Sequence, residues 1–281
     1  MRSYLYVPGN RPRMLTSALS RGADALIVDL EDAVPPAEKH AAREAVAGWL
    51  RTLPPGAPVH VRVNPGDAGL DDARAVVCPA LRGLTVAKAD TVGGLAELSA
   101  VLDRAERAAG LRPGGVDLVP LLETASAILA APALAAAPRV RRLQIGEADL
   151  AAELGVTPGE DERELLFVRS AVVLASAAAG IEPPAAAVTT DFRDLDRLRR
   201  GTIALKRMGF RGRACIHPAQ LPVVNEVFTP TAEELAAARD LVTRFEAAGG
   251  GVCLDATGRM VDLAVVREAR RTLAATGTGE A

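Results

Sequence analysis

Eight short apolar runs recur along the chain, and segments in which apolar residues have helical spacing separate them. The expected strands cover residues 3–7, 25–28, 59–63, 83–88, 118–122, 143–146, 185–190 and 213–216. Regular alternation of strands and helices favours parallel strands that are joined by helical crossovers. Eight such units within 281 residues predict an α/β fold of the TIM (β/α)8 barrel type.

Composition permits a large core and argues against several functions. Hydrophobic residues make up 49% of the chain and aromatic residues 3%, so the core must consist mainly of Ala, Val and Leu. The formal net charge of −2 argues against nucleic-acid binding, which needs a basic face. We find no apolar run of about 18 residues and no secretory leader, so we expect neither membrane insertion nor export.

The three cysteines, Cys78, Cys215 and Cys253, are odd in number and far apart, and none belongs to a CxxC pair. A disulfide framework is therefore not expected, and each thiol is interpreted as a small buried side chain. Together with the lack of a leader, this predicts a cytoplasmic protein.

Charged side chains gather where the expected strands end, whereas the starts of the strands show no such cluster of charged residues. In a TIM barrel the chemistry is located at the carboxyl ends of the strands. This asymmetry therefore predicts an enzyme. The residues at these ends are Asp29, Glu31, Asp32, Arg62, Lys88, Glu123, Asp149, Asp191 and His217.

The stretch 119–150 contains a strand, a helix and a second strand, and each strand is followed by carboxylates. Such a unit makes the two strands parallel and adjacent, so Glu123 and Asp149 should lie close together. A pair of hard oxygen ligands without Cys or His suits Mg²⁺, which fills its other positions with water and substrate oxygens. The alternative is that each carboxylate caps the N-terminus of a helix.

Arg62 ends the strand 59–63 and offers a planar fork of donors that matches a carboxylate. Together with a metal acting as a Lewis acid, it would hold a 2-keto acid and support cleavage of a carbon–carbon bond in a β-hydroxy acid. The alternative is a structural ion pair with Asp29, Glu31 or Asp32.

Two other polar residues at the strand ends have weaker interpretations. Lys88 suggests a Schiff-base aldolase, but several nearby carboxylates would keep its ammonium charged. His217 precedes a proline and is either a base or a structural or ligand-contacting residue. Nucleotide-binding glycine motifs are absent, and the glycines at 249–251 are interpreted as a hinge.

The C-terminal segment exceeds what a barrel requires. Residues 231–247 form an expected helix, opened by Thr231 with Glu234 at capping-box spacing, and residues 263–275 form a final helix. We predict a catalytic barrel at 1–230 and a helical extension at 231–281. The extension would pack on the barrel wall, cover the mouth, or reach a neighbouring subunit.

Ordered motifs along nearly the whole chain are similar to those of one known family. The chain resembles the citrate lyase beta-subunit-like family of the aldolase/citrate lyase superfamily, which includes malyl-CoA and citramalyl-CoA lyases. The motifs are RSYLYVPGN at 2–10, VDLEDAV at 28–34, VRVN at 61–64, LLETA at 121–125, GEADL at 146–150, DFRD at 191–194, CIHPAQ at 215–220 and GRMVD at 258–262.

The resemblance implies a TIM barrel, usually assembled as a homotrimer, with one Mg²⁺ held by Glu123 and Asp149. It implies that Arg62 and Glu123 bind the substrate and that Asp262 is an acid/base. Asp262 would be carried by a C-terminal lid that often reaches the next subunit. The positions that match contacts with the coenzyme A thioester are Tyr6, Arg13, Ile216 and His217.

These observations predict a Mg²⁺-dependent carbon–carbon lyase of the oxo-acid-lyase type, or the reverse condensation. Its substrate would be a 3-hydroxy-3-carboxyacyl-CoA such as malyl-CoA or citramalyl-CoA, giving an acyl-CoA and a 2-keto acid. The alternatives are the beta subunit of a citrate lyase complex, an acyl-CoA thioesterase on the same scaffold, and a non-catalytic partner. The chain departs from the family where Ala87-Lys88-Ala89-Asp90 replaces Pro-Lys-x-Glu, so the acyl group is left open.

Overall fold

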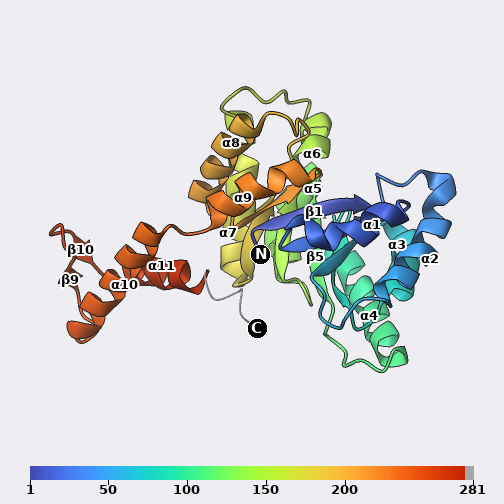
Figure 1. Ribbon diagram of the computed structural model, residues 1–281, viewed down its shortest axis with the longest axis horizontal. Helices are drawn as coiled ribbons and strands as arrows, with labels where there is room; N and C mark the ends of the chain where they lie inside the picture. Colours follow the sequence, from blue (N-terminus) through green and yellow to red (C-terminus); the bar gives the residue numbers. More distant parts are fainter. Residues whose placement is uncertain (276–281) are drawn as a thin grey trace. The chain divides into compact units, whose positions relative to one another are not determined.

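Eight parallel strands close into a barrel in the computed structural model, which describes residues 1–275 (Figure 1). Each strand pairs with the next along the chain, and β8 pairs with β1. The predicted (β/α)8 barrel is therefore confirmed. The strands are β1 (Ser3–Pro8), β2 (Ala25–Asp29), β3 (Val59–Val63), β4 (Leu81–Val86), β5 (Asp117–Leu122), β6 (Arg142–Ile145), β7 (Glu182–Ala186) and β8 (Gly212–Cys215).

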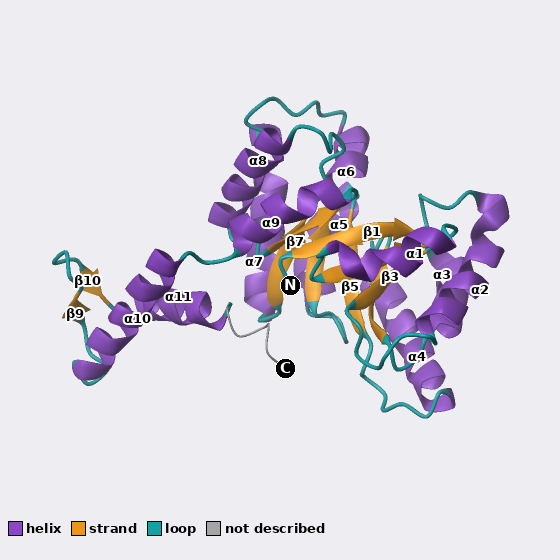
Figure 2. Ribbon diagram, in the orientation of Figure 1, coloured by secondary structure: helices purple, strands orange, loops and turns teal. Residues whose placement is uncertain are grey.

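Helices connect the strands and surround them, as Figure 2 shows. Thr91, Thr124 and Asp194 each cap the following helix by accepting a hydrogen bond from a backbone N–H in its first turn. The helices of this unit are α1 (Pro12–Ala18), α2 (Lys39–Leu50), α3 (Gly66–Val76), α4 (Val92–Ala108), α5 (Ala125–Ala135), α6 (Glu147–Leu154), α7 (Leu166–Ala179), α8 (Leu195–Met208) and α9 (Leu221–Phe228).

Several details differ from the elements expected from the sequence. Helices α3, α6 and α9 were not predicted, and the last two have only eight residues each. Strand β7 begins at Glu182 and includes two prolines, where the sequence suggested residues 185–190. Proline has a low strand propensity because it cannot donate a hydrogen bond to the neighbouring strand. The start of β7 is therefore hard to recognise from the sequence.

Barrel strands are covered on both faces, and every residue of β2 and β3 is buried. Alternation along the strands sorts their side chains between the barrel interior and the surrounding helices. One interior cluster consists of Tyr4, Ala25, Ile27 and Ala185, with Tyr6 packed against it. The interior therefore carries tyrosines among small side chains, which leaves room for polar groups at the mouth.

The second compact unit begins at Glu226, and the first ends at Asn225. It contains α10 (Ala232–Ala247), α11 (Leu263–Ala274) and a small antiparallel hairpin of β9 (Cys253–Leu254) and β10 (Met260–Val261). The predicted capping box at Thr231 and Glu234 is present. The hairpin was not predicted. Residues 276–281 of the predicted extension lie outside the described part of the chain.

The described cysteines are all free, with Cys78 and Cys215 buried and Cys253 partly buried. This agrees with the interpretation that they serve as small apolar side chains. None of the helices in residues 1–275 combines the length and the apolar character that a bilayer crossing requires.

Candidate active site

A pocket of about 260 Å³ lies at the carboxyl ends of the strands. Of the predicted site residues, Tyr6, Arg62, Glu123, Asp149 and Ile216 line it. The other lining residues are Asp32, Leu121, Gln144, Ile145, Gly146, Glu147, Ala148, Ala187 and Val188. Side chains far apart in the sequence thus share one concave surface, as a TIM-barrel active site requires.

Glu123 follows β5 directly and is 3% exposed. Its Oε1 accepts a hydrogen bond of 2.8 Å from the backbone N–H of Lys88. Burial, followed by the proximity of Asp149, raises the pKa of Glu123 to about 7, although the Lys88 N–H and Arg62 favour the charged form. A buried carboxylate beside a second carboxylate is a poorly stabilised anion until a cation joins it.

Asp149 lies in the first turn of α6 and is exposed on the pocket wall. Gly146 separates β6 from this helix, and a Cβ built at Gly146 would lie 3.0 Å from both Cβ and Oε2 of Glu123. A side chain at position 146 would therefore push Glu123 out of place. This requirement for glycine was not recognised in the sequence.

The donor set of this pocket fits Mg²⁺. Only oxygen ligands are available, because neither Cys nor His lines the pocket. Within residues 1–275 no group of three or more His, Cys, Asp or Glu side chains is arranged to hold a metal ion. Two protein carboxylates are sufficient for Mg²⁺, which keeps water and substrate oxygens in its other positions.

Arg62 is buried beside the pocket and forms the ion pairs that the sequence left as an alternative. Its Nε and Nη2 donate to the two carboxylate oxygens of Asp29 at 2.7 and 2.6 Å. Its Nη1 lies 3.1 Å from carboxylate oxygens of both Glu31 and Asp32. Three of its five N–H groups make hydrogen bonds to described residues. The edge of the guanidinium that faces Asp29 is therefore occupied. Arg62 nevertheless lines the pocket.

Lys88 follows β4, and its ammonium donates to Glu31 Oε1 at 3.0 Å. This bond raises the pKa of Lys88 above its usual value, so the amine stays protonated. A Schiff-base nucleophile must be a neutral amine, so the pairing argues against the aldolase interpretation. The neighbouring Asp90 accepts a hydrogen bond of 2.6 Å from the Thr124 hydroxyl, which fixes the residue that follows Glu123.

Tyr6 enters the pocket from β1, and the guanidinium carbon of Arg62 lies 5.1 Å from the centre of its ring. Gln144, on β6, donates from Nε2 to the Tyr6 hydroxyl at 3.1 Å. Burial raises the pKa of Tyr6, so the phenol remains neutral. Gln144 was not predicted, because an uncharged amide within a strand has no distinctive pattern.

The other predicted coenzyme A contacts are arranged differently. His217 accepts a hydrogen bond of 3.1 Å at Nδ1 from the Ala219 N–H and stacks on Phe192 with ring centres 4.5 Å apart. Its neutral ring therefore carries the proton on Nε2. Arg13 is exposed on α1. Neither His217 nor Arg13 is among the residues that line the pocket, whereas Ile216 is, with 41% exposure.

Asp262 belongs to the second unit, where it caps α11. Its Oδ1 accepts hydrogen bonds from the backbone N–H groups of Ala264 and Val265 at 2.9 and 3.1 Å. The residue thus has a local structural role that the sequence argument did not predict, since Asp262 was considered only as an acid/base.

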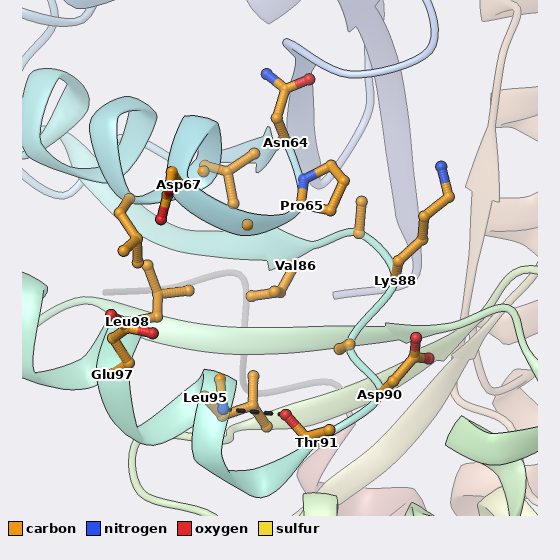
Figure 3. A pocket seen from close by; sticks show the side chains of 17 residues that line it. Asn64, Pro65, Asp67, Val86, Lys88, Asp90, Thr91, Leu95, Glu97 and Leu98 are labelled. Atoms are coloured by element: carbon orange, nitrogen blue, oxygen red, sulfur yellow. Dashed lines mark hydrogen bonds between the residues drawn. The ribbon is translucent and has the colours of Figure 1, made fainter.

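A second pocket, of about 350 Å³, lies between the starts of α3 and α4. Figure 3 shows Lys88 and Asp90 on one side of it and Asp67, Glu97 and Leu98 on the other. Lys88 thus borders this pocket while its backbone contacts Glu123 of the first pocket.

Comparison with known proteins places this architecture in a family. Residues 2–218 match the model of the HpcH/HpaI aldolase/citrate lyase family, and the chain belongs to that family. The chain is 37% identical to a (3S)-malyl-CoA thioesterase of Cereibacter sphaeroides, over 97% of this chain and 93% of that protein. It is 32% identical to the citrate lyase beta subunit of Leuconostoc mesenteroides, over 97% of this chain and 92% of that protein.

The fold is also similar to solved structures of such proteins. One is the protein CitE from Mycobacterium tuberculosis, crystallised in complex with magnesium, acetoacetate and coenzyme A. It superposes with a TM-score of 0.80 at 29% identity and covers 98% of both chains. The family resemblance predicted from the motifs is therefore confirmed.

Proposed function

We propose that this protein is a Mg²⁺-dependent carbon–carbon lyase, or the corresponding condensing enzyme, for a 3-hydroxy-3-carboxyacyl-CoA such as malyl-CoA or citramalyl-CoA. The products of cleavage would be an acyl-CoA and a 2-keto acid. The observation that carries this proposal is the buried carboxylate of Glu123. It lies beside Asp149 in a pocket bordered by Arg62, and no cationic side chain among residues 1–275 forms an ion pair with it.

Glu123 and Asp149 would hold the metal ion. When bound, the ion supplies a Lewis acid that polarises the keto oxygen of the 2-keto acid. The M. tuberculosis relative crystallised with magnesium, a small keto acid and coenzyme A supports this choice of ligands. Binding of a cation would also relieve the unfavourable burial of the Glu123 carboxylate.

The protein's own side chains would bind and orient the substrate. Asp29 holds the guanidinium of Arg62 rigidly, so the N–H groups that remain toward the pocket can bind the carboxylate of the keto acid. Asp262 would move the proton at the carbon next to the thioester, where the bond to the keto acid breaks or forms. Tyr6, Arg13, Ile216 and His217 would contact the coenzyme A thioester.

Two related activities have specific support and are the alternatives. The thioesterase from C. sphaeroides, at 37% identity, favours hydrolysis of the same kind of thioester. The Leuconostoc protein, at 32% identity, favours a beta subunit of a citrate lyase complex that acts on a citryl thioester.

Product analysis on the purified protein separates the three activities. The protein would be incubated with Mg²⁺ and malyl-CoA, citramalyl-CoA or citryl-CoA, and with acetyl-CoA or propionyl-CoA plus glyoxylate, pyruvate or oxaloacetate. We expect a keto acid and an acyl-CoA from the first set. Free coenzyme A with an intact hydroxy acid would identify a thioesterase, and turnover only with added citrate lyase subunits would identify a complex subunit. Undiminished rates in EDTA would contradict the metal-dependent mechanism.

We further propose that the protein is a homotrimer in which the extension at 231–281 forms a lid and Asp262 acts in the site of a neighbouring subunit. Mixing experiments test this directly. Asp262→Asn and Glu123→Gln subunits, each expected to be slow alone, would be unfolded together and refolded. If Asp262 acts across the subunit boundary, mixed oligomers regain activity. If Asp262 acts within its own chain, every active site still lacks either Glu123 or Asp262. Mixing then restores no activity.

A further inference from the structure

Lys88 has an unusual backbone conformation for a residue with a side chain. Its φ is +49°, and among residues 1–275 only Arg139 and Glu162 share positive φ without being glycine. This left-handed region is unfavourable for a residue that carries a Cβ atom. Lys88 follows β4 at the carboxyl end of the barrel, where strain is kept only if the surroundings enforce it.

The strained turn directs the Lys88 N–H at Glu123. The hydrogen bond to Oε1 is 2.8 Å long, and no other N–H of the described chain donates to this carboxylate in the structure. Oε2 accepts no such bond, and it faces Gly146, where a Cβ would approach it to 3.0 Å. One oxygen is thus held by the backbone, and the other is left available on the side of α6 and Asp149.

The side chain of Lys88 connects this carboxylate to the arginine side of the pocket. Its ammonium lies 3.0 Å from Oε1 of Glu31, and Oε2 of the same Glu31 lies 3.1 Å from Nη1 of Arg62. Glu31 itself is buried, with its side chain 4% exposed. Lys88 therefore makes two contacts in this site. Its backbone N–H contacts Glu123, the carboxylate proposed to bind the metal, and its ammonium contacts Glu31, the neighbour of Arg62.

We infer that Lys88 is a positioning residue, whose left-handed backbone fixes Glu123 so that one carboxylate oxygen remains free for the metal ion. This inference rests on the proposed function, because it assigns a role within the same site. The backbone carries the effect, and the ammonium secures the turn through Glu31. Residues that can adopt positive φ and keep the N–H should therefore replace Lys88, and residues that cannot should fail.

Four variants separate the backbone from the charge. Lys88→Gly keeps the N–H and favours positive φ, and Lys88→Met keeps the N–H but removes the ammonium and its hydrogen bond to Glu31. Lys88→Val disfavours positive φ because its side chain is β-branched, and Lys88→Pro removes the N–H. The readouts are the Mg²⁺ dissociation constant by calorimetry, the melting temperature, and KM and kcat with the substrate that the product screen identifies.

We expect the Mg²⁺ affinity of Lys88→Gly and Lys88→Met to stay within about threefold of the wild-type value. Lys88→Val and Lys88→Pro should bind Mg²⁺ about tenfold or more weakly, because this is the effect of losing one hydrogen bond to a charged group. Equal Mg²⁺ affinity in all four variants would overturn the inference. Failure of the wild-type protein to bind Mg²⁺ would instead overturn the proposed function. If the valine and proline variants do not fold, crystals of the wild type soaked in Mg²⁺ decide. The ion should sit on Oε2 with the Lys88 bond intact, and an ion on Oε1 would refute the inference.

Discussion

Two glutamates at the mouth of the barrel, Glu123 after β5 and Glu147 after β6, have opposite surroundings. Glu147 forms a bidentate pair with one edge of a guanidinium, since Nε and Nη2 of Arg169 donate to its two oxygens at 2.6 and 2.7 Å. Glu123 forms no ion pair with a described cationic side chain and instead neighbours Asp149, with the Lys88 N–H as its hydrogen-bond donor. Both residues line the same pocket.

We propose that this difference separates a structural carboxylate, Glu147, from a functional one, Glu123. Where the fold needs an acid at the start of α6, it supplies a buried arginine whose charge is satisfied, and Glu162 adds a second partner. At Glu123, by contrast, no described cationic side chain forms an ion pair with the carboxylate, and burial raises its pKa to about 7. An acid left in this state is one that an incoming cation can stabilise.

The largest effect should come from Glu123→Gln. We expect Mg²⁺-dependent turnover to fall about 1000-fold, because a neutral amide replaces a carboxylate ligand of the Lewis acid. The melting temperature should stay the same or rise, since a poorly solvated anion has been removed. Steady-state kinetics and calorimetry on the same preparation check both parts. Substantial unfolding would show that Glu123 is structural, as Glu147 is.

Glu147→Gln is the matched control, with the reverse outcome. It leaves the buried Arg169 with Glu162 alone, so we expect the free energy of unfolding to drop by about 3 kcal/mol. Turnover per folded molecule should change only a few-fold. Urea unfolding and active-site titration measure the two quantities. If Glu147→Gln lost Mg²⁺ affinity but kept its stability, the proposed difference between Glu147 and Glu123 would be wrong.

The pKa of Glu123 predicts a pH dependence of stability in the metal-free protein. Its folded value of about 7 exceeds the ordinary value of 4.5, so the folded state holds this proton more tightly. The resulting stabilisation is complete below about pH 4.5 and is lost as the pH rises through 7, for a total of about 3 kcal/mol. Urea unfolding of the wild type and Glu123→Gln at pH 5 and pH 8 isolates this contribution. A constant difference between the two proteins would contradict it.

A third kind of carboxylate, Asp262, is held by backbone N–H groups, and its variants should give the smallest effect on stability. Asp262→Ala loses the cap of α11 and should cost about 1 kcal/mol, whereas Asp262→Asn keeps a capping oxygen. Both should be slow enzymes if the carboxylate transfers a proton. Thermal unfolding with kinetics checks this. Normal turnover in Asp262→Asn would exclude a role in proton transfer, and capping of α11 would then be the only role of Asp262 supported by the structure.

Local patterns in the sequence predicted much of this molecule. Apolar runs located all eight strands of the barrel. The capping box at Thr231 was likewise visible from spacing. Placement of Glu123 and Asp149 in one pocket followed from the handedness and adjacency of a strand–helix–strand unit, which are properties of short segments.

The tertiary structure alone decided which charged groups are paired. Glu147 and Glu123 look alike in the sequence, and only the position of Arg169 on α7 distinguishes them. Arg62 could be interpreted from sequence as a substrate ligand or as a structural residue, and the fold shows its fork on Asp29. Hydrophobic periodicity and capping act between near neighbours in the chain, so they can be read from sequence. Ion pairing and burial depend on atoms that only folding brings together, and so does the role that we propose for Lys88.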